Sequence, residues 1–311
     1  MKKEKHSGDE KVKCSLCNSS RYKQKYYIEK NGASFNVVRC VDCGMIYLNP
    51  RPSSKKIDDM YDEDYFHGKG FDKGVDYLEG LKYRKVWEPW HNSRLMTIER
   101  YVKNLLVEKK GEKRGSILDV GCGLGEFLIV ARDAGWDAKG VELSKYSADI
   151  AKKKFKLDVF NGRLDDVNTT GKFKEKFDVI TMIEVIEHLP NPLENLKKCH
   201  ELLKHQGIIV IQTGDVESLY SKIKGKNWPY YLAGHLNYFS RRTLKRMLEK
   251  AGFEVIKIYS GDEISFRARL QCLSLLKRQK LINKTEHLKQ IIMHIVRKMG
   301  LGGMTVYAKR K

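Results

Sequence analysis

Residues 116–127 decide the fold and read Ser116-Ile117-Leu118-Asp119-Val120-Gly121-Cys122-Gly123-Leu124-Gly125-Glu126-Phe127. An apolar strand ends in an acid, three glycines follow at every second position, and an apolar helix begins. Glycines let the backbone turn sharply and approach a ligand with no Cβ in the way. The order of strand, glycine loop and helix separates this pattern from a chance cluster of glycines. The stretch therefore predicts the floor of a nucleotide-type cofactor site.

The length and composition suit a folded globular protein. The 311 residues are enough for one large domain and a small one, and 41% of them are apolar and 32% charged. No apolar run approaches the roughly 20 residues of a membrane span. Polar residues follow the basic start of the chain, which argues against a signal peptide. We therefore expect a cytoplasmic protein whose seven cysteines are thiols or metal ligands rather than disulfides.

The net charge of +21 is concentrated near the C-terminus, where residues 241–311 hold 18 Lys and Arg against 5 Asp and Glu and so carry +13. A basic surface of this size suits nucleic acid or an anionic membrane. A solvated, lysine-rich surface gives the same count. Charge alone does not decide between these interpretations.

Two cysteine pairs with matching spacing stand near the N-terminus, Cys14-x-x-Cys17 and Cys40-x-x-Cys43. Each pair can place two thiolates on one ion, and two pairs complete a closed tetrahedral site. Apolar residues on either side of Asn31-Gly32 predict two short strands joined by a turn. We therefore predict that residues 14–52 form a structural zinc ribbon, with no open position for water or substrate.

The remaining boundaries follow from composition and periodicity. Residues 1–13 are charged and are expected to form a flexible tail, and residues 111–311 are expected to form the cofactor-binding domain. Between ribbon and domain, residues 53–110 are expected to form a connector and a helical cap. Its first part mixes Tyr, Asp and Gly and suggests a flap over the site. Its second part, from about residue 84 to 107, has apolar residues spaced by three or four and predicts a helix.

Strands and helices alternate after residue 116, which predicts a doubly wound α/β sheet with its ligand at the carboxyl ends of the strands. A long aromatic-rich loop at 214–239 and a basic helical region at 267–298 interrupt the alternation. The predicted strands are Ile117–Val120, Lys139–Leu143, Leu157–Phe160, Phe177–Ile183, Gly207–Gln212, Phe253–Tyr259 and Met304–Ala308. The predicted helices are Glu126–Ala134, Leu193–Leu203, and two that are capped by Ser144 and Ser240.

Two acids indicate which cofactor the glycine loop holds. Glu142 ends the second predicted strand, where a carboxylate can accept both ribose hydroxyls of an adenosine. Asp119 stands directly before the loop, where its charge would repel a pyrophosphate and would suit an ammonium or sulfonium group. The pair therefore favours S-adenosylmethionine over a nicotinamide dinucleotide.

With these motifs in place, the chain resembles the class I S-adenosylmethionine-dependent methyltransferases over about residues 84–311. Within that superfamily it is similar to the branch with the polyprenyl-quinone O-methyltransferases and many enzymes of surface-glycan gene clusters. An N-terminal ribbon running into Leu48-Asn49-Pro50-Arg51-Pro52 is familiar in front of such domains. The other matching runs are Leu118–Gly125, Phe177-Asp178-Val179-Ile180, Glu184–Pro192, Leu202-Leu203-Lys204 with Gly207, His235–Ser240 and Ala251-Gly252-Phe253.

The resemblance implies a Rossmann-like seven-stranded sheet whose last strand, Met304–Ala308, is antiparallel. It assigns Asp119, Gly121 and Gly123 to the methionine end of the cofactor and Glu142 to the ribose. Where the family usually has an acid after the glycine equivalent to Gly162, this chain has Arg163, which leaves Asp165 as the alternative contact for the adenine amine. The other cofactor contacts that the resemblance implies are Gly125, Leu143, Leu164, Ile183 and Glu184.

Methyl transfer needs alignment and exclusion of water above all, and it needs a base only if the acceptor must lose a proton. His188, after the fourth strand, and His235, in the aromatic loop, are the candidates for that base. Glu187-His188 can instead fix the loop or orient the cofactor, and His235 can instead contact the substrate. Tyr230 and Tyr231 either line an acceptor pocket or only pack.

Three functions are consistent with these features. The leading hypothesis is a methyltransferase that acts on a small molecule, a sugar or a lipid-linked acceptor, with O-methylation favoured. The second is an RNA methyltransferase that holds RNA with the ribbon and the basic C-terminal region. The third is a non-catalytic adaptor that binds the cofactor. The sequence does not predict the oligomeric state.

Overall fold

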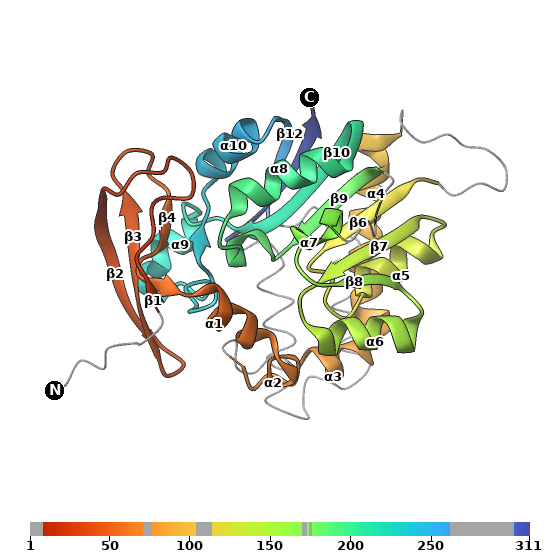
Figure 1. The fold of residues 1–311 in the computed structure, drawn as a ribbon, viewed down its shortest axis with the longest axis horizontal. Coiled ribbons are helices and arrows are strands. Elements are labelled where there is room, and N and C mark those ends of the chain that lie inside the picture. Colours follow the sequence, from red (N-terminus) through yellow and green to blue (C-terminus); the bar gives the residue numbers. More distant parts are fainter. Residues whose placement is uncertain (1–8, 71–75, 104–113, 170–172, 174–175, 262–301) are drawn as a thin grey trace.

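The computed structural model describes residues 9–70, 76–103, 114–169, 173, 176–261 and 302–311. At its centre lies a seven-stranded sheet in the order β12-β13-β10-β9-β6-β7-β8 (Figure 1). Neighbours from β10 to β8 are parallel, whereas β13 runs antiparallel to both β10 and β12. The predicted Rossmann-like sheet with an antiparallel last strand is therefore confirmed. Its strands are β6 (Ser116–Val120), β7 (Asp137–Glu142), β8 (Asp158–Asn161), β9 (Phe177–Ile183), β10 (Leu203–Gly214), β12 (Phe253–Ser260) and β13 (Gly303–Arg310).

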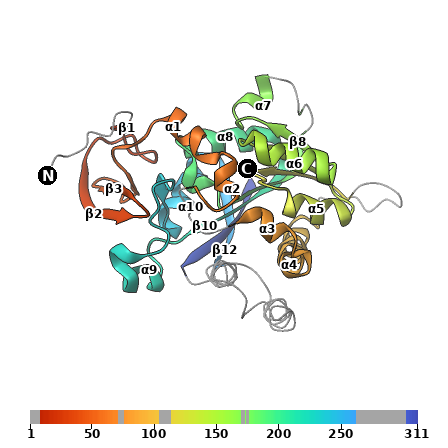
Figure 2. The same cartoon turned by 90° about the horizontal axis from the view of Figure 1, so that it is seen from below.

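Helices cover both faces of this sheet, because its central strands are apolar on both sides as buried parallel strands are (Figure 2). Leu118 and Ile180 pack in one core cluster with side chains of α8 and α10. The neighbouring residues Ile117 and Val179 face the other way and pack with side chains of α4 and α5. The helices around the sheet are α4 (Arg84–Val102), α5 (Glu126–Asp133), α6 (Lys145–Phe155), α7 (Asp166–Thr169), α8 (Pro192–Leu202) and α10 (Arg241–Lys250).

The two serines predicted to cap helices behave differently in the structure. Ser240 caps α10 through a capping box with Thr243, as predicted. Ser144 occupies the N-cap position of α6, but its side chain makes no capping hydrogen bond, and its backbone N–H donates to Glu142 instead. The part of the predicted helix beyond residue 103 and the basic region 267–298 lie outside the described residues.

The cysteine-bearing segment forms a β-ribbon, as predicted. Strands β2 (Tyr22–Lys30) and β3 (Ala33–Cys40) form a hairpin, and the positive φ angles of +54° at Asn31 and +78° at Gly32 are typical of its tight turn. Strand β4 (Ile46–Leu48) pairs with β3, and β11 (Asn237–Tyr238) then pairs with β4. The long aromatic-rich loop of the main domain therefore supplies the fourth strand of the ribbon sheet.

Short elements connect the ribbon to the main domain (Figure 1). Asp9–Glu10, within the predicted tail, form β1 and pair with β5 (Arg51–Pro52). The predicted flap contains α1 (Ser54–Asp58), the 3-10 helix η1 (Asp59–Tyr61), α2 (Glu63–Phe66) and α3 (Tyr77–Leu81). The loops of the main domain add η2 (Ile186–His188), α9 (Leu219–Lys224) and η3 (Gly225–Asn227). In the described part of the chain, no helix is both long and apolar enough to span a bilayer.

Candidate active site

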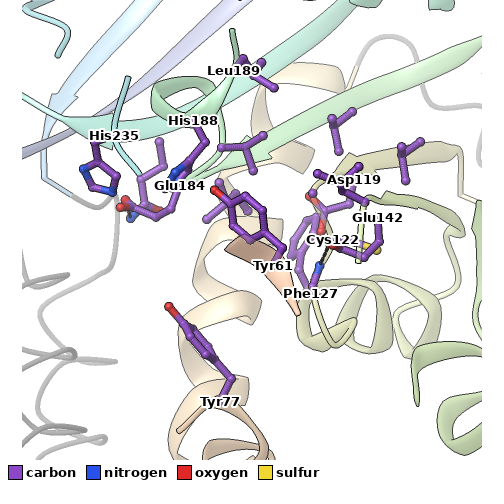
Figure 3. Close-up of a pocket in the computed structure, with 18 of the residues that line it drawn as sticks. Tyr61, Tyr77, Asp119, Cys122, Phe127, Glu142, Glu184, His188, Leu189 and His235 are labelled. Atoms are coloured by element: carbon purple, nitrogen blue, oxygen red, sulfur yellow. Dashed lines mark hydrogen bonds between the residues drawn. The ribbon is translucent and has the colours of Figure 1, made fainter. Parts of the chain in front are cut away.

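A cavity of about 360 Å³ lies at the carboxyl ends of β6, β7 and β9. Figure 3 shows Asp119 and Glu142 on one side of it and Glu184, His188 and His235 on the other. The glycine loop, the connector and the aromatic-rich loop all contribute to its wall. The residues predicted from the sequence that line it are Asp119, Gly121, Gly123, Glu142, Leu143, Leu164, Ile183, Glu184, His188 and His235.

Two glycines of the loop have different roles. Gly123 has φ +54°, and a Cβ placed there would meet no atom within 4 Å, so its missing side chain leaves open space beside the cavity. Gly125, with φ +88°, is the N-cap of α5, and a Cβ there would lie 2.3 Å from Leu157 Cδ1. Gly125 is not among the residues that line the cavity and allows α5 to pack closely.

Glu142 is held in place before any ligand arrives. One carboxylate oxygen accepts a hydrogen bond from the Gly123 N–H and the other from the Ser144 N–H, both at 2.8 Å. Each carboxylate oxygen can accept a second hydrogen bond, so both remain able to accept a ribose hydroxyl. Burial raises the pKa of this carboxyl, while the backbone N–H groups oppose the rise.

Asp119 is buried at the end of β6 and accepts a hydrogen bond from Thr181 Oγ1 at 2.6 Å. Burial raises its pKa to about 7, although Thr181 and the buried Arg94 of α4 act in the opposite direction. A cationic ligand would offset the cost of burying this charge. The site therefore favours a ligand with a positive group next to the glycine loop.

Tyr230 joins two glutamates on the far side of the cavity. Its hydroxyl lies 2.7 Å from Glu187 Oε1 and is also hydrogen-bonded to Glu184. Gln212 Nε2 donates to the other oxygen of Glu184 at 3.1 Å. Burial raises the pKa of Glu187 to about 7, since Glu187 is fully buried. Because one hydroxyl has one proton, it cannot donate to both carboxylates at once.

His188 and His235 lie together, with ring centroids 4.6 Å apart. His188 Nδ1 lies 2.9 Å from the carbonyl oxygen of Gly234, and His235 Nδ1 lies 2.7 Å from that of Tyr230. Because a carbonyl only accepts, each Nδ1 carries a proton, and a ring that is neutral presents its lone pair at Nε2. Burial, and then the nearby His188, lower the pKa of His235 well below its ordinary value, which keeps its ring neutral.

The same corner of the cavity has the donor set of a cation site. Ligand atoms of Glu187, His188 and His235 lie within 4.8 Å of one another. Carboxylate oxygen and imidazole nitrogen are common ligands of divalent cations. The sequence placed His188 and His235 near the acceptor, but it did not indicate that these two residues and Glu187 converge.

Aromatic side chains of the connector form part of the cavity wall. Tyr61 packs edge-on against His188 with ring centroids 5.9 Å apart, and the hydroxyls of Tyr65 and Tyr77 lie 3.2 Å apart. His91 of α4 also lines the cavity, and nothing in the pattern of that helix marked it. Tyr230, Arg163 and Asp165 line the cavity, whereas Tyr231 is buried in a core cluster that the ribbon shares with the aromatic-rich loop.

Comparison with known proteins places the chain in a family. A family model described as a methyltransferase domain matches residues 91–258, more than half of the sequence. The chain belongs to the methyltransferase domain family. Together with the sheet topology, this confirms the class I methyltransferase resemblance.

Several curated methyltransferases are similar over part of their length. The Ubiquinone biosynthesis O-methyltransferase of Actinobacillus pleuropneumoniae serotype 7 (strain AP76) is 35% identical over 152 residues, which are 45% of this chain and 65% of that protein. The protein of the same name from Coxiella burnetii (strain Dugway 5J108-111) is 29% identical over 150 residues, 46% of this chain and 64% of that protein. The chain therefore spans slightly less than two thirds of the length of these relatives.

Among solved structures, the plantazolicin methyltransferase BamL in complex with a triazolic desmethylPZN analog and SAH has a TM-score of 0.52. It is 13% identical and the match covers 79% of this chain and 93% of that chain. At that identity the similarity concerns the fold alone.

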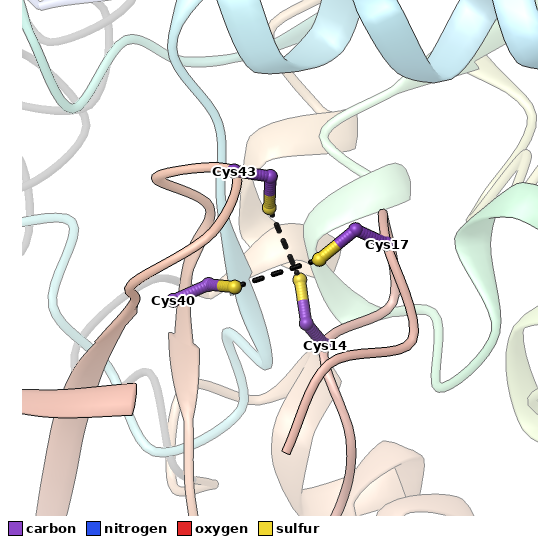
Figure 4. Close-up of side chains that lie close together, drawn as sticks. All are labelled: Cys14, Cys17, Cys40 and Cys43. Atoms are coloured by element: carbon purple, nitrogen blue, oxygen red, sulfur yellow. Dashed lines mark hydrogen bonds between the residues drawn. The ribbon is translucent and has the colours of Figure 1, made fainter. Parts of the chain in front are cut away.

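The chain also has a cluster of four thiols in its ribbon (Figure 4). Cys14 and Cys43 place their sulfurs 3.4 Å apart, and Cys17 and Cys40 place theirs 3.5 Å apart. All four sulfurs lie within 4.8 Å of one another. A tetrahedral zinc site with Zn–S bonds of about 2.3 Å has sulfurs roughly 3.8 Å apart, so the four cysteines fit a zinc ion.

Proposed function

We propose that this protein transfers a methyl group from S-adenosylmethionine to a hydroxyl oxygen of a small-molecule acceptor. The observation that carries the proposal is one cavity with Asp119 and Glu142 at the glycine loop and His188 and His235 opposite them (Figure 3). The names of the relatives support an O-methyltransferase. The aromatic wall suits a planar or apolar acceptor better than a fully hydrated one.

In this proposal, S-adenosylmethionine supplies a methyl carbon that its sulfonium has already activated. Glu142 binds the ribose, and Asp119 holds the positive methionine end. The connector and the aromatic-rich loop exclude water and align the acceptor hydroxyl. His235, with its neutral ring and Nε2 lone pair, or His188 beside it, removes the proton from that hydroxyl.

The pKa of Asp119 leads to a prediction for cofactor binding. A cationic ligand binds the charged carboxylate, so below the pKa of about 7 binding must release a proton. We expect the affinity for S-adenosylmethionine to fall about tenfold per pH unit below pH 7 and to level off above it. Asp119→Asn should bind more weakly than the wild type above pH 7, approach the wild-type affinity at low pH, and lose this slope. Calorimetry in two buffers of different ionisation enthalpy measures both the affinity and the released proton; an unchanged slope in Asp119→Asn would contradict the assignment.

Substitution of His188 and His235 tests whether either histidine acts in catalysis. Removal of a general base lowers kcat by about 100-fold or more, so we expect His235→Ala or His188→Ala to do so while affinity for S-adenosylmethionine changes little. His205→Ala, at an exposed position, is the matched control. Assays with excess Mg²⁺ and with EDTA distinguish a base from a cation ligand, because only a lost ligand is partly restored by added cation. Full activity of both variants would refute a catalytic histidine.

The acceptor class requires a direct test. We expect the full chain to transfer a labelled methyl group to a hydroxylated aromatic such as 3,4-dihydroxybenzoate in preference to a nucleotide sugar or transfer RNA. Transfer to RNA alone, with strong salt dependence, would overturn the proposal in favour of the RNA methyltransferase. Binding of S-adenosylmethionine without transfer to any acceptor would favour the adaptor.

We also propose that the four ribbon cysteines bind one structural zinc ion. Four thiolates leave no open coordination position, so the ion would support the fold and not the chemistry. The predicted domain boundaries and the cytoplasmic location stay predictions.

A further inference from the structure

Each cysteine pair of the ribbon forms a turn, called a knuckle here, at Cys14–Cys17 and at Cys40–Cys43. Both knuckles lie against the main domain. Cys14, Cys40 and Cys43 belong to the same core cluster as side chains of α8 and α10. In the first knuckle, Leu16 is 1% exposed and its carbonyl oxygen accepts a hydrogen bond from Lys250 of α10 at 2.9 Å. The thiol cluster therefore lies at an interface and not on a free appendage.

The side chain of Asn237 joins the first knuckle to the loop that carries Glu187 and His188, called the active-site loop here. Asn237 is 2% exposed, and its Oδ1 accepts a hydrogen bond from Ser15 Oγ at 3.0 Å, between Cys14 and Cys17. Its Nδ2 donates to the carbonyl oxygen of Leu189 at 2.8 Å, and Leu189 directly follows His188. Asn237 thus uses both ends of its amide to tie the knuckle to that loop.

The backbone around Asn237 carries the same connection. Asn237 pairs with Tyr47 of β4, while the N–H of Leu236 donates to the carbonyl oxygen of Glu187 at 2.8 Å. The carbonyl oxygen of Leu236 in turn accepts from the N–H of Leu48 at 3.0 Å. The residue that follows His235 is therefore bonded to the ribbon on one side and to the active-site loop on the other.

Two basic side chains of the ribbon segment add ties. Arg51 Nη1 donates to the carbonyl oxygen of Pro190 at 2.7 Å. Lys30 Nζ, at the end of β2, donates to the carbonyl oxygens of Pro229 at 2.7 Å and Tyr231 at 3.2 Å. Lys30 therefore holds the backbone on both sides of Tyr230, and Arg51 holds the loop just after His188.

We propose that the cysteine ribbon supports the loops on the acceptor side of the cavity from behind, and that Asn237 is the positioning residue that transmits the location of the ribbon to His188 and His235. This inference rests on the proposed function for its catalytic consequence. The structural part of the inference can be tested without the proposed function. Disturbing the first knuckle should shift the acceptor side of the cavity and leave the cofactor side unchanged. Glu142 and Asp119 belong to β7 and β6, and their described hydrogen bonds involve no ribbon residue.

Ser15→Ala tests this link with little risk to the fold, because the residue is only partly buried and the change removes one hydroxyl. Ser19→Ala is the matched control, since the Ser19 hydroxyl bonds Asp42 on the exposed side of the same ribbon. Incorporated 5-fluorotryptophan gives four ¹⁹F signals, and Trp228→Phe identifies the one in the aromatic-rich loop. Trp228 is buried and stacks on Tyr230 with ring centroids 5.1 Å apart.

We expect Ser15→Ala, and more strongly Asn237→Ala, to shift or broaden the Trp228 signal while those of Trp87, Trp90 and Trp136 stay in place. Affinity for S-adenosylmethionine should stay within about twofold, which also shows that the variants are folded, whereas misplacing the histidines by a fraction of an ångström should lower kcat/KM for the acceptor about 10- to 100-fold. An unmoved Trp228 signal in both variants would overturn the inference. Failure of the wild-type protein to bind S-adenosylmethionine would instead overturn the proposed function.

Discussion

Glu142→Ala is expected to lower the affinity for S-adenosylmethionine by about 100- to 10,000-fold, because two charge-assisted hydrogen bonds of about 1.5–3 kcal/mol each would be lost. The expectation rests on a carboxylate that is buried, is already oriented by the N–H groups of Gly123 and Ser144, and lines the cavity. Calorimetry on the wild-type and variant proteins measures the change directly.

The same substitution also frees two backbone N–H groups, so its effect on the loop has to be separated from its effect on the ligand. Glu142→Gln keeps the size of the side chain and one acceptor oxygen, and it should bind S-adenosylmethionine with an intermediate affinity. Glu201→Ala, at an exposed position on α8, is the control for loss of a charge. Equal affinity in wild-type protein and Glu142→Ala would remove the cofactor assignment, whatever the melting temperature of the variant.

Cys40→Ser is expected to reduce the zinc content from one ion per chain to none and to unfold the ribbon. Structural zinc contributes about 10–16 kcal/mol in small zinc-finger peptides, which is comparable to the whole stability of a typical domain. Because the cluster lies in a core shared with α8 and α10, the loss should lower the melting temperature of the main domain as well. Metal analysis and thermal unfolding provide the two measurements.

Cys199→Ser is the matched control, since Cys199 is a buried free cysteine outside the thiol cluster. It should lower stability through a buried hydroxyl but keep the full zinc content. A purified wild-type protein that is well folded and contains no metal would refute the zinc ribbon. If Cys40→Ser lost its zinc but melted at the wild-type temperature, the assignment of the metal site would stand, but the proposed structural role of the zinc would be contradicted.

The parts of the site that the sequence predicted are those that local spacing determines. Asp119, Glu142 and the glycines of the loop follow from a strand, a turn and a helix that are consecutive in the chain. The two cysteine pairs follow from the short knuckle each pair forms. His188 was placed near the acceptor because it follows the fourth predicted strand, and His235 because it lies in the aromatic-rich loop.

The parts that were missed depend on register between distant segments. The tie between Ser15 and Asn237 joins residues 222 positions apart, and the bridge from Tyr230 to Glu187 joins residues 43 apart. No periodicity within either segment encodes such a pairing. His91 was missed for a related reason, because a histidine on one face of a helix has no marker until the helix is packed.

The strand β11 has a consequence for how the chain becomes folded during synthesis. The ribbon leaves the ribosome before the main domain, yet the strand that completes its sheet is Asn237–Tyr238, which is made long after Ile46–Leu48. Until then, the edge of β4 that β11 later covers presents unpaired backbone groups to other chains, which is the arrangement that favours misassembly. The first 52 residues expressed alone would retain that open edge, so the ribbon and the main domain are expected to reach their final form together.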